Sequence, residues 1–167
     1  MTRDDRLERL FGADGPPLRH VSSRRRFDCL VATAAMVTDT RYDEVAKRLP
    51  PFKYGMPGVL ARPLFESLTG TKWRLARCRW FSPKFAELPP AESIRVLAIK
   101  KPGWFRAYHC VALEGDWVHD PAFKRPIPQV SYPMRHCRVP IILVPENIRA
   151  YVDFRRKRRF ANALASD

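Results

Sequence analysis

The sequence predicts a single α+β domain in which the helices come first and the strands follow. Between residues 29 and 68 apolar side chains recur at helical spacing, whereas after Gly70 they alternate with polar neighbours as in strands. The chain has 167 residues, enough for one domain with a real core and too few for two comfortable ones. Helices followed by strands favour N-terminal helices packed on a C-terminal antiparallel β-sheet over alternating α/β.

Three helices are expected in the first half. Residues 29–37 are nearly all small or apolar, and Asp28 directly before them is a favourable N-cap residue. Residues 42–49 carry the next helical pattern, which two prolines end. Residues 60–68 carry the third, with Gly70 just past its end. The small residues of the first helix would let other elements pack closely against it.

The second half predicts five strands. Two of them are joined by the tight Glu114-Gly115-Asp116 turn, which makes them an antiparallel hairpin. The predicted strands are residues 73–75, 94–99, 108–113, 117–119 and 139–144.

The ends of the chain differ in character from this centre. Residues 1–17 form a polar arm that ends in Gly-Pro-Pro, and residues 18–145 form the domain. Residues 146–167 form a basic tail with five consecutive cations between two phenylalanines. Such a run is either a solvated surface or an anion-binding tail for a nucleic acid or an acidic protein. The five cations are Arg155, Arg156, Lys157, Arg158 and Arg159.

Composition and charge exclude several classes of protein. Lys and Arg number 31 and Asp and Glu 17, which gives a formal net charge of +14 and points to an anionic partner. The sequence contains no run of about 18 apolar residues, so no membrane span is predicted. The N-terminus is charged where a signal peptide is apolar, and the four cysteines are widely spaced without a C-x-x-C pair. We therefore expect a cytoplasmic protein with reduced thiols and with no metal and no organic cofactor.

Three residues with chemical potential fall where the predicted elements bring them together. Cys29 begins a helix, where the helix dipole and free N–H groups favour a thiolate. His109 lies in strand 108–113, and Asp120 directly follows strand 117–119. Because these strands form a hairpin, Asp120 returns beside His109, where a carboxylate can orient the imidazole. A thiolate with an imidazole base is what nucleophilic acyl chemistry needs.

The order of these motifs resembles papain-like cysteine peptidases, and among them the bacteriocin-leader (double-glycine) peptidases. The resemblance rests on Asp28-Cys29 at a helix start, on His109 at a strand start and on the Asp120-Pro121 turn, and it covers roughly residues 20–145. It implies a papain-like fold and a peptide or protein substrate. It also implies that Cys29 is the nucleophile, His109 the general base and acid, and Asp120 the orienting residue.

Two positions depart from the family pattern. Leu30 stands where the family usually has Gly, and Ser23 stands where the family has a Gln that donates to the oxyanion. The single Gln of the chain, Gln129, is far downstream. Ser23 and its neighbour Arg24 are therefore the expected replacement donors, together with the backbone N–H of Cys29. Loss of a donor typically lowers the rate by about 10²–10³.

Two functions follow, of different classes. The first is a cysteine peptidase or amidase of a bacterium or phage, which cleaves a peptide-like bond through Cys29, His109 and Asp120. Transfer of the acyl group on the same triad stays open, because only the resolving nucleophile differs. The alternative is a weak or inactive papain-like fold that serves as a basic binding module for nucleic acid or an acidic partner. Taken singly, each triad residue also has an ordinary structural explanation, as a core cysteine, a core histidine and a turn residue.

Overall fold

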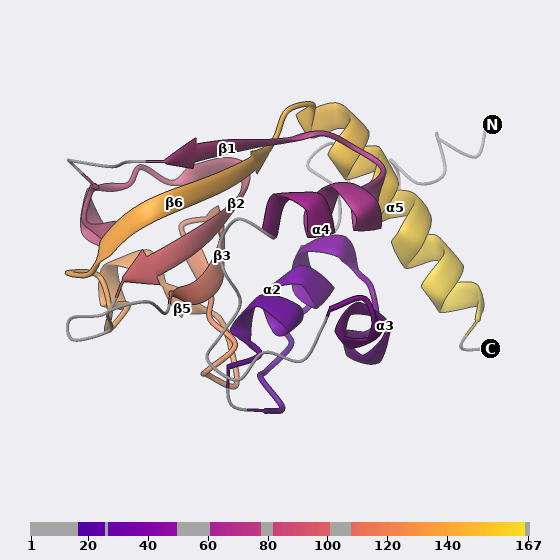
Figure 1. The fold of residues 1–167 in the computed structure, drawn as a ribbon, viewed down its shortest axis with the longest axis horizontal. Helices are drawn as coiled ribbons and strands as arrows, with labels where there is room; N and C mark the ends of the chain where they lie inside the picture. The colour runs from indigo at the N-terminus through magenta and orange to yellow at the C-terminus, as the bar shows by residue number, and fades with distance from the viewer. Residues whose placement is uncertain (1–16, 26, 50–60, 78–81, 101–107, 166–167) are drawn as a thin grey trace.

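A computed structural model describes residues 17–25, 27–49, 61–77, 82–100 and 108–165 (Figure 1). In this part of the chain the three predicted helices come first and the predicted strands follow, and one further helix comes after the last strand. The helices are α2 (Cys29–Thr38), α3 (Tyr42–Lys47), α4 (Ala61–Thr69) and α5 (Ile148–Leu164). The strands are β1 (Trp73–Arg77), β2 (Ala91–Lys100), β3 (His109–Gly115), β4 (Trp117–His119), β5 (Ile127–Pro128) and β6 (Arg138–Pro145). The polar arm expected over residues 1–17 lies almost wholly outside the described residues.

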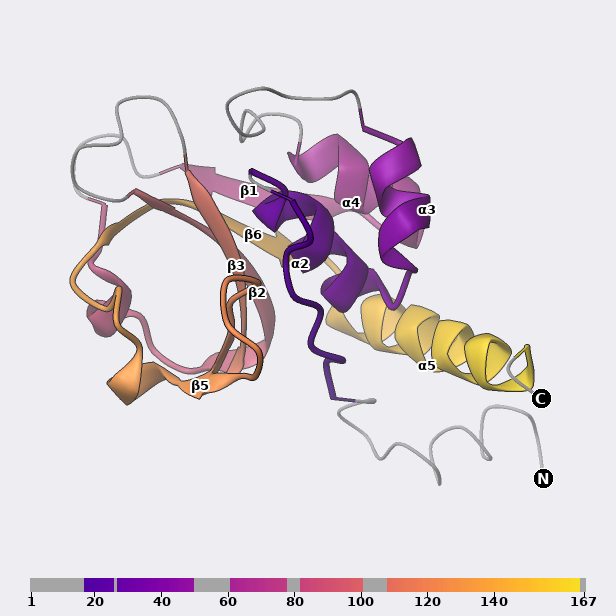
Figure 2. The same cartoon turned by 90° about the horizontal axis from the view of Figure 1, so that it is seen from below.

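The strands form one antiparallel sheet in the order β1-β6-β2-β3-β4-β5. Figure 2 shows that α2, α3 and α4 lie together on one side of this sheet, which curls away from them. One apolar cluster fills the layer between the helices and the sheet, and a second lies on the opposite face of the sheet. The expected α+β arrangement of N-terminal helices on an antiparallel sheet is therefore confirmed.

Small side chains let α2 pack directly on β3, as its sequence predicts. Ala32 and Ala34 are fully buried, and so is Thr33 between them. The Thr33 hydroxyl donates to the carbonyl of Cys110 in β3 at 3.0 Å. A polar group in this layer thus has its partner, and the first turns of α2 are fixed against the start of β3.

Asp28 does not cap α2 with its side chain, in contrast to the expectation from sequence. Its Oδ2 instead accepts from the backbone N–H groups of Arg24 at 2.9 Å and Arg25 at 2.8 Å, and from the hydroxyl of Tyr42. Phe27 has a φ of 69°, a left-handed conformation that turns the chain into the helix. The buried carboxylate therefore holds the loop before Cys29 rather than the helix after it.

The segment expected to be a basic tail is helix α5, and it belongs to the domain. Asn147 caps it by accepting from the Ala150 N–H at 2.9 Å. Tyr151 and Val152 join the core between helices and sheet, and the Tyr151 hydroxyl donates to the Val37 carbonyl at 2.8 Å. Because five cations follow these residues, the composition of the segment does not indicate that one face of the helix is apolar.

None of the helices described here combines the length and apolar character needed to cross a membrane.

Candidate active site

Cys29 begins α2 and turns its sulfur toward the start of β3. The backbone N–H of Cys110 donates to Cys29 Sγ at 3.4 Å, and the carbonyl oxygen of Tyr108 lies 4.0 Å from the same sulfur. The side chain of Cys29 is half-buried. The residue between these two backbone groups is His109, so the sulfur lies beside the first residue of β3.

His109 and Asp120 form a buried pair on the β3–β4 hairpin. The pairing of Ala112 with His119 brings the residue after β4 back toward the first residue of β3. His109 Nε2 lies 2.7 Å from Asp120 Oδ1, and Asp120 is fully buried. With Nε2 engaged by the carboxylate, Nδ1 is the ring nitrogen left for Cys29.

The charges around His109 favour its protonated form. Burial acts most strongly and lowers the pKa of His109, but hydrogen bonds to Asp120 and Cys29, together with their negative charges, raise it to about 9. Burial also disfavours the charged form of Asp120 and so raises its pKa. The hydrogen bond and charge of His109 outweigh burial, and the pKa of Asp120 lies below its usual value. The pair is therefore an imidazolium and a carboxylate at neutral pH.

Tyr132 completes the hydrogen bonds of the Asp120 carboxylate. The Tyr132 hydroxyl donates to Oδ2 at 2.7 Å, while the Ala122 N–H donates to Oδ1 at 2.8 Å. Tyr132 is buried and follows the short 3₁₀ turn Gln129–Ser131. Tyr132 could not be found from the sequence, because nothing in the spacing around it ties it to Asp120.

Replacing Tyr132 with phenylalanine is expected to lower the free energy of unfolding by about 1–3 kcal/mol, because a buried charge loses one hydrogen bond. The lowered pKa of Asp120 stabilises the fold at pH values above its unfolded pKa, and this stabilisation is lost as pH falls through the folded pKa. Loss of the Tyr132 hydroxyl raises that folded pKa, so acid unfolding should begin at higher pH. Denaturant unfolding measured from pH 3 to pH 7 tests both effects.

Tyr151→Phe is the matched control, since its buried hydroxyl donates to a neutral carbonyl, that of Val37. It should lower stability at all these pH values without changing the pH dependence. A Tyr132→Phe profile parallel to that of Tyr151→Phe would contradict the coupling of Tyr132 to Asp120.

Ser23 and Arg24 are the expected oxyanion donors, and the structure gives partners to the Ser23 backbone N–H and to the Arg24 guanidinium. The backbone N–H of Ser23 donates to the carbonyl of Pro121 at 2.8 Å, which ties the N-terminal segment to the turn after Asp120. The guanidinium of Arg24 pairs with Asp43 at 3.1 Å and lies 4.5 Å above the ring of Tyr42. Among the described residues, neither side chain forms a hydrogen bond with the Cys29 sulfur.

Cys29 opens onto a small apolar cavity between α2 and the sheet. Its volume is about 30 Å³, which is enough for a group about the size of a water molecule. Cys29 and Cys110 both line it. The other lining residues are Leu30, Ala61, Val96, Ala98, Tyr108, Ile141 and Leu143.

The basic run of α5 is largely paired with carboxylates of the same chain. Arg155 is 3% exposed and contacts Asp39 at 3.3 Å, and Arg159 contacts the same carboxylate at 2.6 Å. Arg158 pairs with Glu44 at 2.9 Å. Arg156 lies 3.4 Å from Asp153, and Lys157 is exposed. These pairs do not support an anion-binding tail, because most of its charge is already matched within the domain.

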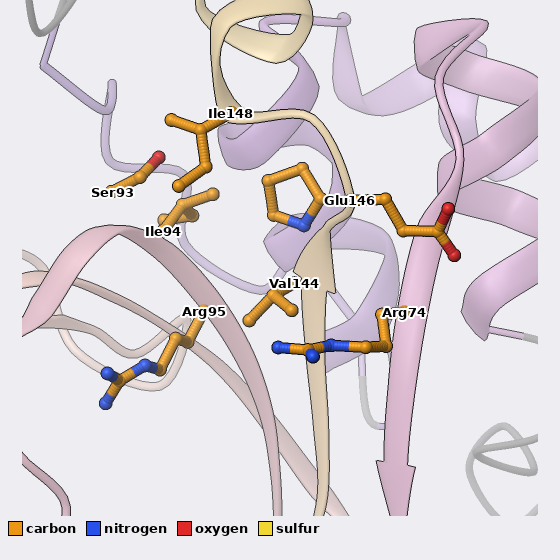
Figure 3. Close-up of a pocket in the computed structure, with 8 residues that line it drawn as sticks. Arg74, Ser93, Ile94, Arg95, Val144, Glu146 and Ile148 are labelled. Carbon is orange, nitrogen blue, oxygen red and sulfur yellow. The ribbon is translucent and has the colours of Figure 1, made fainter.

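A wider hollow lies at the other end of β2. Its volume is about 370 Å³, and Figure 3 shows the Arg74 guanidinium beside Val144, with Arg95 on the adjacent strand. Ile94 in this hollow pairs with Glu114, whereas His109 pairs with Ile99 at the opposite end of the strand. The hollow is therefore separate from the Cys29–His109–Asp120 cluster.

One solved structure is similar to this chain over most of its length. It is a double glycine motif protease from an AMS/PCAT transporter, in complex with the leader peptide. The match has a TM-score of 0.53 at 14% identity and covers 81% of this chain and 95% of that chain. No protein-family model matches the sequence, and no curated protein matches it. The similarity shows that the two chains share the papain-like α+β fold.

Proposed function

We propose that this chain is a papain-like cysteine peptidase or amidase that cleaves a peptide-like bond. The observation that carries the proposal is the position of the Cys29 sulfur, at the start of β3 beside the buried His109–Asp120 pair. A thiol, an imidazole and an orienting carboxylate in this order have the roles of nucleophile, base and positioning group. The shared fold with a double glycine motif protease agrees with this chemistry.

The reaction proceeds through an acyl-thioester. Cys29 Sγ attacks the carbonyl carbon of the substrate, with its proton held by His109, and the C–N bond then breaks as the imidazolium gives that proton to the leaving amine. Water, activated by the neutral imidazole, releases the acid product. Asp120 holds the ring through Nε2 and leaves Nδ1 toward the sulfur.

The oxyanion needs a donor, and the first turn of α2 offers one. The first N–H groups of a helix have no partner within the helix, so the Cys29 N–H is available to a substrate oxygen. Asp28 supports this arrangement because it fixes the backbone of Arg24 and Arg25 directly before the nucleophile. This donor replaces the missing Gln in our proposal.

We further propose that the substrate is a peptide with a double-glycine site, in line with the motifs around Cys29 and His109. The solved neighbour is a protease of that type bound to a leader peptide. Synthetic peptides with a central Gly-Gly pair, compared with the same peptides carrying Leu-Leu, test this choice by mass spectrometry of the products. If neither peptide is cleaved although Cys29 still has an activated thiol, the double-glycine substrate is wrong and the site acts on a different class of peptide-like substrate.

Selective alkylation of Cys29 tests the proposed nucleophile directly. We expect iodoacetamide near pH 7 to modify Cys29 faster than Cys110 and Cys137, because only Cys29 is half-exposed beside an imidazolium. Peptide mapping after short exposures gives the rate at each thiol. In His109→Ala the rate at Cys29 should fall toward that of the other thiols, and equal rates in both proteins would count against the proposal.

The pKa of His109 also predicts an alkaline limit to turnover. Because the imidazolium must protonate the leaving amine, kcat/KM should fall as pH rises through about 9. A pH–rate profile on any cleaved peptide measures this limb. A fall centred near 6.5, the ordinary value for histidine, would show that the charges of Asp120 and Cys29 do not act on the ring as proposed.

A further inference from the structure

A second thiol stands beside the proposed nucleophile and has no part in the mechanism above. Cys110 follows His109 directly, and its backbone N–H donates to Cys29 Sγ at 3.4 Å. Its side chain is 7% exposed and belongs to the apolar cluster between helices and sheet, against which Cys29 also packs. Both thiols line the same small cavity.

The packing of α2 on β3 holds the two cysteines in register. Thr33 follows Cys29 by one helical turn, so both side chains lie on the same face of α2. The Thr33 hydroxyl binds the Cys110 carbonyl at 3.0 Å, and Cys29 Sγ accepts from the N–H of the same residue. The helix face is thus anchored at both backbone groups of Cys110.

The two sulfur atoms lie near the same backbone nitrogen, that of Cys110. Three covalent bonds separate this nitrogen from the Cys110 sulfur, so that sulfur lies within roughly 4 Å of the atom that contacts Cys29 Sγ. A bond between them requires side-chain rotations that bring the two sulfur atoms to the S–S distance of about 2 Å. The cavity of about 30 Å³ that both cysteines line has room for one added oxygen atom.

The two thiols are unequal, which sets the order of any oxidation. Burial raises the pKa of the Cys110 thiol well above its usual value, and the charge of Cys29 raises it further. Cys29 is half-exposed and stands beside the imidazolium of His109. An oxidant from solvent therefore meets Cys29 first, and Cys110 stays a thiol until then.

We propose that Cys29 and Cys110 form a peroxide-induced disulfide that reversibly blocks the active site. The inference rests on the proposed function, because it needs Cys29 to be an activated thiolate. The Cys29 thiolate attacks hydrogen peroxide, the O–O bond breaks, and a sulfenic acid and hydroxide form. The hydroxide takes up the former thiol proton, which His109 holds, and becomes water. The Cys110 sulfur then attacks Cys29 Sγ, the S–O bond breaks, and the hydroxyl leaves as water with the Cys110 proton. In sum, two thiols and one peroxide give one disulfide and two waters.

The other described thiol is a poor competitor for Cys29. Cys137 packs against the apolar cluster on the opposite face of the sheet, and Cys110 packs in the cluster that contains α2. Cys78 falls outside the described residues. A Cys78→Ser, Cys137→Ser protein therefore serves as the parent, because it holds only the two thiols in question.

The test is a small molar excess of hydrogen peroxide on this parent, because sulfinic acid takes two peroxides per thiol, followed by alkylation under denaturing conditions and peptide mapping. We expect a linked Cys29–Cys110 peptide that dithiothreitol removes, with iodoacetamide labelling of native Cys29 restored. Adding Cys110→Ala should instead give Cys29 sulfinic acid, with labelling not restored by dithiothreitol. Where that variant does not fold, the linked peptide from the parent alone decides, since its formation needs no variant.

The outcomes separate the two proposals. Suppose that iodoacetamide labels Cys29 rapidly before treatment, and that peroxide then gives as much Cys29 sulfinic acid in the parent as in the Cys110→Ala protein. This result would overturn the disulfide and leave the peptidase proposal intact. Cys29 that reacts with neither iodoacetamide nor peroxide would overturn both, because no activated thiolate exists. A mixed disulfide between two chains, seen as a dimer on non-reducing gels, would also overturn the intramolecular bond.

Discussion

Asp120→Ala is expected to reduce kcat/KM by about 10⁴ while Cys29 and His109 stay in place. The carboxylate acts on the ring through His109 Nε2 at 2.7 Å, in a fully buried position. Without it the imidazole loses both the group that fixes its orientation and the charge that raises its pKa to about 9. The substitution also leaves the Tyr132 hydroxyl and the Ala122 N–H without their acceptor.

Asp120→Asn separates these two contributions. The Ala122 N–H donates to Oδ1, the same oxygen that His109 Nε2 contacts, so an asparagine is pinned with its carbonyl oxygen at this position. The amide nitrogen then faces the Tyr132 hydroxyl, which can turn to accept. The ring keeps its orientation and loses only the charge, so activity should fall much less than in Asp120→Ala.

The pH profiles of the two variants distinguish orientation from charge. In Asp120→Asn the alkaline limb of kcat/KM should move below the value near 9 expected for the unmodified protein, since a neutral amide no longer stabilises the imidazolium. Circular dichroism and unfolding midpoints check that both variants fold. Equal, large losses of kcat/KM in both variants would contradict this separation. They would mean that the loss comes from the charge of Asp120, and that the Ala122 N–H does not fix the orientation of the asparagine amide.

The parts of the site that local sequence patterns encode could be predicted. A run of small residues after Asp28 gives a helix that must begin near Cys29, and the Glu114-Gly115-Asp116 turn gives a hairpin that returns Asp120 to His109. Both inferences use contacts between neighbours in sequence. The position of the Cys29 sulfur relative to β3 depends on these local elements and on the packing of α2 against β3, where Thr33 binds the Cys110 carbonyl.

The rest depends on contacts that sequence does not encode locally. Tyr132 reaches Asp120 from a 3₁₀ turn on the far side of a loop, and no periodicity marks it. Asp28 looks like an ordinary helix cap, but its carboxylate binds the loop before it, because Tyr42 of α3 lies against it. In both cases an acidic residue takes its partners from tertiary structure, where a hydroxyl happens to be buried beside it.

The net charge of +14 led to the largest difference between expectation and structure. A run of cations in sequence says nothing about which carboxylates it meets after folding. Asp39 ends α2 and receives two arginines of α5, one of which also lies 3.6 Å from Glu114. The charge therefore serves partly to fix α5 on the domain, and the proposed chemistry does not use it.

Asp39→Asn is expected to destabilise the domain by about 3–5 kcal/mol, as loss of one partner does in other buried ion pairs. Asp39 has a φ of 49°, a conformation that asparagine tolerates well, so the substitution adds little backbone strain. Its Oδ1 and Oδ2 accept from Arg159 and Arg155. An amide must turn its N–H₂ toward one of these guanidinium groups, which leaves a buried cation facing a donor.

Urea unfolding with a matched control measures this effect. The Arg41–Glu44 pair lies on the surface, with the Arg41 side chain 82% exposed, so Arg41→Ala should change stability by less than about 1 kcal/mol. Adding Arg155→Met to Asp39→Asn should recover part of the loss, because the unpaired cation is then gone and methionine fills the same buried space. A double variant less stable than Asp39→Asn alone would show that Glu114 is sufficient as a partner for Arg155. Arg155 would then still hold helix α5 on the domain, through Glu114 rather than through Asp39.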